Sequence, residues 1–93
     1  MLEEKIKQNA IVVMQHCVGL GRKKPYKRHG KLFYRPYRNY FATGAQDELW
    51  EAIRKEGYAT ARKEQSHVFY FLTREGLDWL GKQIGVYIHD ESD

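Results

Sequence analysis

Residues 68–77, VFYFLTREGL, join a predicted β-strand to a predicted helix. The first five residues are aromatic, β-branched or aliphatic, which favours a strand, and apolar side chains on both faces predict that it is covered on both sides. Thr73 then serves as the N-cap of a helix. Leu77, Leu80 and Ile84 follow at helical spacing, so we expect this helix to end near Gly85.

The residues before this strand predict a β-hairpin that follows a helix. Residues 58–63 form the expected first strand of the hairpin, which turns around residues 64–67. Thr43 and Gln46 match a capping box, so the spacing predicts a helix from Thr43 to a stop at Gly57. Leu49, Trp50 and Ile53 form the apolar face of this helix, and Trp50 and Trp79 are the expected core anchors.

Residues 49–58 (LWEAIRKEGY) and 68–77 resemble the second half of winged-helix proteins, a helix-turn-helix variant with a β-hairpin after its third helix. The shared pattern is a helix, a glycine, an aromatic residue, a hairpin and then Leu-Thr-x-x-Gly. This resemblance implies an α+β fold class: a small winged-helix-like domain with three to four helices plus a β-hairpin wing.

The helix in the recognition position has an unfavourable charge for DNA. A helix-turn-helix protein inserts this helix into the major groove. Here it carries four acids against two cations: Asp47, Glu48, Glu51 and Glu56 against Arg54 and Lys55. Repulsion from phosphates argues against standard docking of this helix.

Residues 16–20, residues 37–41 and the Leu72-Thr73…Gly76 segment are also similar to a family of short, uncharacterised phage and prophage proteins. That resemblance implies a phage or prophage context and hence a bacterial host cell. The single cysteine, Cys17, and the lack of a signal-peptide pattern predict a cytoplasmic location there. The resemblance supplies no catalytic or binding residue that maps onto this chain.

A first helix is expected over Leu2–Val18, with apolar residues at helical spacing and a glycine stop at Gly19. His16 and Cys17 would point about 100° apart on this helix. We therefore expect a buried cysteine and a half-exposed histidine, not a nucleophile and its base.

The segment Arg22–Phe41, RKKPYKRHGKLFYRPYRNYF, mixes cations with aromatic rings and contains no acid. His29-Gly30 predicts a hairpin turn that pairs Pro25–Arg28 with Lys31–Arg35, and residues 37–42 are expected to form a short helix. We expect most of the rings to lie in the core and most of the cations to be exposed. Like charges repel, so the segment requires ring burial or an anionic partner to offset that cost.

Charge is divided unevenly along the chain. Residues 5–46 hold ten Lys or Arg and no acid, whereas the whole chain has a net charge of +4. Such asymmetry predicts a basic face directed at an anion. The candidate nucleic-acid-binding residues are Arg22, Lys23, Lys24, Lys27, Arg28, Lys31, Arg35, Arg38, Arg62 and Lys63.

Two functions stay open at this point. The first is non-specific nucleic-acid binding, with DNA favoured over RNA, in which cations contact phosphates and rings stack on bases. The second is a protein-interaction module that docks on an acidic host or phage protein surface. A homodimer is compatible with either.

The remaining expectations concern organisation and chemistry. We expect a single winged-helix-like domain over residues 1–88, with Val86–Ile88 as a last short strand or packed tail, and a frayed acidic tail over 89–93. The N-terminus does not resemble a signal peptide, and the longest aliphatic run, Ala10–Met14, is too short to span a membrane. The four histidines lack partners at metal-ligand spacing, so we expect no enzyme, no cofactor and no metal.

Overall fold

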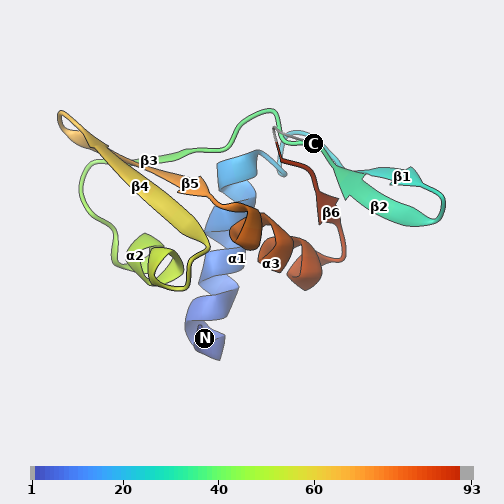
Figure 1. The fold of residues 1–93 in the computed structure, drawn as a ribbon, viewed down its shortest axis with the longest axis horizontal. Helices are drawn as coiled ribbons and strands as arrows, with labels where there is room; N and C mark the ends of the chain where they lie inside the picture. Colours follow the sequence, from blue (N-terminus) through green and yellow to red (C-terminus); the bar gives the residue numbers. More distant parts are fainter. Residues whose placement is uncertain (1, 91–93) are drawn as a thin grey trace.

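The computed structural model describes residues 2–90, which form an α+β arrangement of three helices and six short strands (Figure 1). The helices are α1 (Glu4–Val18), α2 (Glu48–Lys55) and α3 (Arg74–Ile84). The strands are β1 (Tyr26–Arg28), β2 (Lys31–Tyr34), β3 (Phe41–Thr43), β4 (Ala59–Glu64), β5 (His67–Leu72) and β6 (Tyr87–Ile88). No helix among the described residues is long and apolar enough to cross a membrane.

The strands form two separate three-stranded sheets. One sheet has the order β3-β5-β4, with antiparallel pairs throughout. The other has the order β1-β2-β6, in which β1 and β2 are antiparallel and β2 and β6 are parallel. The β4–β5 hairpin and the β1–β2 hairpin project at opposite ends of the molecule (Figure 1).

Helix α1 ends where the sequence predicts. Ala10, Met14 and Cys17 are fully buried against the other elements. Gly19 adopts the left-handed conformation with φ 77° and closes the helix. A Cβ atom at Gly19 would also overlap the ring of Tyr37, so glycine serves both the turn and the packing.

The predicted β4–β5 hairpin and the helix after it are confirmed, and their ends are joined tightly. The Thr73 side chain accepts a bond from Gly76 N at 3.0 Å, as an N-cap does, and donates to the carbonyl of Gly57 at 2.7 Å. The backbone N–H of Thr73 donates to the carbonyl of Tyr58 at 3.0 Å. The Leu-Thr-x-x-Gly pattern therefore fastens α3 to the chain that enters β4.

Helix α2 begins later than predicted, because Thr43 is not its N-cap. Thr43 lies in β3, where it pairs with Val68 of β5. The cap is Asp47, whose Oδ1 accepts a hydrogen bond from Trp50 N at 3.0 Å. Thr43 and Gln46 have the spacing of a capping box only by coincidence. The pairing of β3 with β5 determines where Thr43 lies.

The short helix predicted over residues 37–42 is wrong. Residues 37–40 have no regular structure, and β3 starts at Phe41, which pairs with Tyr70. Asn39 helps to prevent a helix, because its side-chain amide is bonded to both backbone groups of Leu72. Aromatic residues are also weak helix formers.

Strand β5 is covered on one face only, contrary to the prediction. Val68, Tyr70 and Leu72 are buried, and the Trp50 ring of α2 stacks on Tyr70 at 5.3 Å. Phe69 and Phe71 point to the other face and are only half-buried. The helices pack on the first face, so the second remains open.

The rings of the basic segment are not mostly core, which corrects a second expectation. Tyr34 is fully buried, whereas Tyr26, Tyr37 and Tyr40 are exposed. The reason is that the β1–β2 hairpin projects from the helices, while the connector after it crosses the C-terminal end of α1 at the surface (Figure 1). Among the predicted anchors outside this segment, Trp50 is buried, while Trp79 is half-buried and stacks on Tyr58 at 5.1 Å.

The last short strand is confirmed as β6, which pairs in parallel with β2. The N–H of His89 continues this pairing by donating to the carbonyl of Tyr34 at 2.9 Å. Residues 91–93 of the expected frayed tail lie outside the described residues.

Candidate nucleic-acid interface

The ten predicted cations do not gather into a single patch. Eight belong to residues 22–38, on and around the β1–β2 hairpin, whereas Arg62 and Lys63 lie on β4. These two hairpins are at opposite ends of the longest dimension, which measures 43 Å (Figure 1). The structure therefore separates the basic segment from the β4 cations.

The β1–β2 hairpin turns at His29 and Gly30, as the sequence predicts. Both residues have positive φ angles, 52° and 76°, as a two-residue hairpin turn requires. The register pairs Tyr26 with Phe33 and Arg28 with Lys31. Since side chains alternate between the faces of a strand, these four residues share one face.

Arg28 and Lys31 place like charges directly opposite each other at the end of the hairpin. Such a pair lowers the stability of a sheet. Within residues 2–90, the ion pairs join other residues, and neither of these two cations reaches a carboxylate. An anionic partner would relieve this repulsion.

Aromatic rings cover the same face of the hairpin nearer to the helices. The Tyr26 ring lies 5.8 Å from Phe33, and Phe33 lies 6.0 Å from both Tyr87 and His89. The Tyr26 hydroxyl is 3.2 Å from His89 Nε2. The rings thus hold the hairpin against β6 and keep its cationic end extended.

Two cations of the segment have structural roles. The Lys23 ammonium donates to the carbonyl of Arg35 at 2.7 Å, across the base of the hairpin. The guanidinium of Arg38 donates to the carbonyl of His16 in the last turn of α1 and lies over the rings of Tyr37 and Tyr40. Cations stabilise the C-terminal end of a helix, so Arg38 contributes to the fold whether or not a ligand binds.

The two β4 cations point to opposite faces of their strand. Arg62 lies 3.5 Å from Glu64 and 5.4 Å from the Phe71 ring, on the open face of the sheet. Lys63 lines a groove between the tip of the β4–β5 hairpin and the start of α2. They therefore cannot contact one phosphate together.

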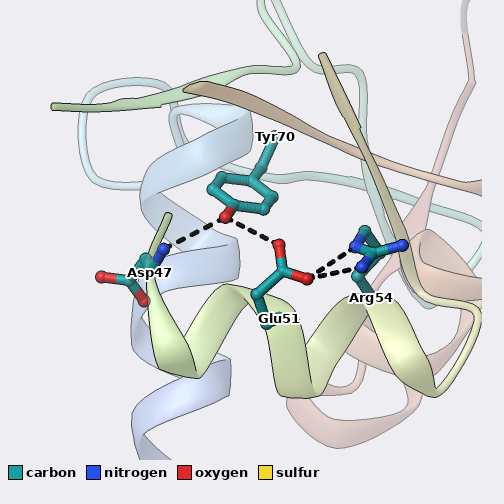
Figure 2. Close-up of polar contacts among 4 residues, drawn as sticks. All are labelled: Asp47, Glu51, Arg54 and Tyr70. Carbon is teal, nitrogen blue, oxygen red and sulfur yellow. Dashed lines mark hydrogen bonds and ion pairs between the residues drawn. The ribbon is translucent and has the colours of Figure 1, made fainter. Parts of the chain in front are cut away.

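The polar side chains of α2 form a hydrogen-bonded network with Tyr70 of β5 (Figure 2). Tyr70 donates through its hydroxyl to Glu51 Oε2 at 2.9 Å and accepts from Asp47 N at 3.2 Å. Arg54 donates through Nε and Nη2 to Glu51 Oε1, and this contact holds the pKa of Glu51 below its ordinary value. Arg54 is thus already neutralised, and α2 packs against β4 and α1, so this helix is poorly suited to bind phosphates.

Cys17 is a buried structural residue, as predicted. Burial raises the pKa of its thiol to about 12, and the thiol lies 3.4 Å from Asn39 Oδ1. A protonated, enclosed thiol is a poor nucleophile and a poor metal ligand. Among residues 2–90, no three His, Cys, Asp or Glu side chains lie close enough together to hold a metal ion.

The sequence did not predict the open face of the β3-β5-β4 sheet. Phe69 and Phe71 lie on this face beside Arg62, and Tyr40 reaches it from the connector before β3. No polar alternation marks the face in the sequence, because β5 is apolar at nearly every position. The aromatic run of β5 is the signal for this face, but the run predicts a strand that is covered on both sides.

Comparison of the chain with protein-family models, with curated proteins and with solved structures finds no match. The winged-helix and phage resemblances therefore stay predictions. Function is inferred from the geometry and charge of the residues themselves.

Proposed function

We propose that this protein binds nucleic acid through the β1–β2 hairpin and its flanks, largely without base specificity. The observation that carries the proposal is the pair of opposed cations, Arg28 and Lys31, at the end of a hairpin with no carboxylate within reach among the described residues. Phosphate contacts from Lys and Arg supply affinity without reading sequence.

The shape of the hairpin supports this proposal. Its outer part, which carries Lys27, Arg28 and Lys31, lies beyond the pairing with β6 and is a two-stranded ribbon that extends from the body of the molecule (Figure 1). A ribbon of this kind can follow a phosphate backbone or enter a wide groove. The acidic helix α2 lies at the other end of the molecule, beneath β4, where it would not oppose that contact (Figure 1).

We also propose that the fold is related to the winged-helix domain. In that relationship the β4–β5 hairpin corresponds to the wing and α2 to the recognition helix. The phosphate contacts that we propose come instead from the β1–β2 hairpin, which the resemblance does not include. Docking through α2 is disfavoured by its acids and by the engagement of Arg54 with Glu51.

A salt series tests the proposal. Fluorescence anisotropy would follow labelled duplex and single-stranded DNA, with matched RNA for comparison. Replacing Lys24, Lys27 and Lys31 by Gln removes three exposed cations of the hairpin region. If each contacts a phosphate, log K against log salt flattens by about three units on duplex and about two on a single strand.

The matched control replaces three exposed lysines outside the segment: Lys5→Gln, Lys55→Gln and Lys82→Gln. Both variants lose the same formal charge, so a non-local effect of net charge would change both slopes equally. An equal change in the two variants contradicts the hairpin as the site. Absence of any salt-sensitive binding by the wild-type protein would contradict nucleic-acid binding and leave an acidic protein surface as the partner of these cations.

A further inference from the structure

We propose that the open face of the β3-β5-β4 sheet is a stacking platform for the bases of single-stranded nucleic acid. The inference rests on the proposed function and names its ligand class. The open-face platform consists of Arg38, Tyr40, Arg62, His67, Phe69 and Phe71.

The platform arises because successive side chains of a strand point to opposite faces of the sheet. In β5 the buried side chains alternate with Phe69 and Phe71, which are half-buried on the outer face. The register places Arg62 directly opposite Phe69. Thr60 pairs with Phe71 and Ala42 pairs with Phe69, so a small side chain lies beside each ring and both rings stay half-exposed.

The planar groups form a continuous row across the sheet. The guanidinium of Arg38 lies 5.9 Å from the Tyr40 ring, Tyr40 lies 6.4 Å from Phe69, and Phe69 lies 6.3 Å from His67. Beside this row, the guanidinium of Arg62 lies 5.4 Å from the Phe71 ring. Bases stack on aromatic rings and on guanidinium planes alike.

The charge on the platform favours an anionic occupant. Arg38 and Arg62 lie among the rings, while Glu64 is the carboxylate at this end of β4 and pairs with Arg62. A purely apolar partner would leave the Arg38 guanidinium without a counter-charge, because Glu64 already pairs with Arg62. A nucleotide combines a flat apolar ring with a phosphate, and so it complements both parts of the surface.

The platform can act only on an unpaired strand. In a duplex, the faces of the bases are covered by their neighbours, whereas a single strand can present them to protein rings. The connector between β2 and β3, which carries Arg35 and Arg38, runs from the β1–β2 hairpin to this sheet (Figure 1). A single strand bound at the hairpin could therefore continue along the connector to Phe69.

The test is the double variant Tyr40→Leu, Phe69→Leu, which removes two rings but keeps apolar side chains. Anisotropy would compare labelled oligodeoxythymidine, which does not self-pair, with a duplex of the same length. We expect the affinity for the single strand to fall about fivefold or more, with the affinity for duplex unchanged. The salt slope should stay as in the wild type, because the hairpin cations remain.

Phe69→Tyr is the conservative control, because it keeps a ring at the position and should retain binding. Urea unfolding of each variant would establish that the sheet is intact. Unchanged single-strand affinity in the double variant would overturn the platform while leaving the hairpin proposal standing. An equal loss on duplex and single strand would also overturn it. A third outcome would overturn it as well: the wild-type protein sediments as a dimer, and the double variant is a monomer that binds the single strand as tightly as the wild type. A second copy of the chain would then cover this face.

Discussion

At the scale of single residues, Asn39 performs the role of a strand residue although no strand includes it. Its side-chain Oδ1 accepts from Leu72 N at 2.9 Å, and its Nδ2 donates to Leu72 O at 3.0 Å. A side-chain amide thus replaces the backbone pairing that β3 would otherwise have to supply. This contact anchors the connector, and with it Arg38 and Tyr40, beside the end of β5.

Cys17 gives a prediction about alkaline pH. Burial raises the pKa of its thiol from 9.0 to about 12 in the folded state. The folded protein therefore keeps a proton that the unfolded chain loses, so this contribution to stability is complete below pH 9 and is lost as the pH rises toward 12. At about pH 10 the loss should be about 1.4 kcal/mol in the free energy of unfolding.

Urea unfolding of the wild type and of Cys17→Ala at about pH 8 and about pH 10 measures this loss. The alanine variant should lose less stability between the two values. Tyr34 and Tyr70, whose pKa values burial also raises, titrate in both proteins and cancel in the comparison. Equal losses in the two proteins would show that the thiol is not the group responsible.

At the scale of elements, the joint between α3 and the start of β4 depends on Gly76. A Cβ atom there would overlap the carbonyl oxygen of Tyr58. Helix propensity alone predicts that Gly76→Ala stabilises α3 by up to about 1 kcal/mol. We expect the opposite, a loss of about 1–3 kcal/mol, because the helix must move away from the Tyr58 backbone.

Urea unfolding again provides the measurement, and Gly44→Ala is the control. A Cβ atom at Gly44 has no neighbour within 4 Å, so this change should be close to neutral. A stabilised Gly76→Ala protein would mean that the close approach to Tyr58 does not exist in solution.

The elements that local chemistry specifies were predicted well from the sequence. Gly19 ends α1, His29-Gly30 turns the first hairpin, and Thr73 caps α3, each through contacts within a few residues. The wrong predictions concern features that depend on contacts between residues distant in the sequence. Thr43 pairs with Val68, and no helix covers Phe69, so neither local spacing nor composition could indicate the outcome.

The same distinction applies to the candidate site. The sequence identified the cations, because charge is visible without a fold. It could not show that Arg38 binds the end of α1, or that β4, which carries Arg62, lies at the opposite end of the molecule from the β1–β2 hairpin. The open-face platform went unpredicted because the half-burial of Phe69 and Phe71 depends on which sheet face the helices occupy.

At the scale of the whole molecule, charge is segregated along the longest dimension, with the cationic hairpin at one end and the acidic helix α2 toward the other (Figure 1). Repulsion within the hairpin should destabilise the fold when no anion is bound. The triple variant Lys24→Gln, Lys27→Gln, Lys31→Gln should therefore be more stable than the wild type at low ionic strength, by about 0.5–1 kcal/mol. The difference should shrink as salt screens the charges and vanish near about 1 M, where the Debye length is about 3 Å.

Urea unfolding across a chloride series would follow both proteins beside the variant Lys5→Gln, Lys55→Gln, Lys82→Gln. Lys55 and Lys82 lie one helical turn after Glu51 and Asp78, so removing them takes away favourable charge pairs and should give no gain at low salt. An equal gain in both variants would trace the repulsion to the net charge of +4 and not to the hairpin. A gain confined to the hairpin variant would mean that the cations of the β1–β2 hairpin are held together against their own repulsion, as a surface that binds an anion requires.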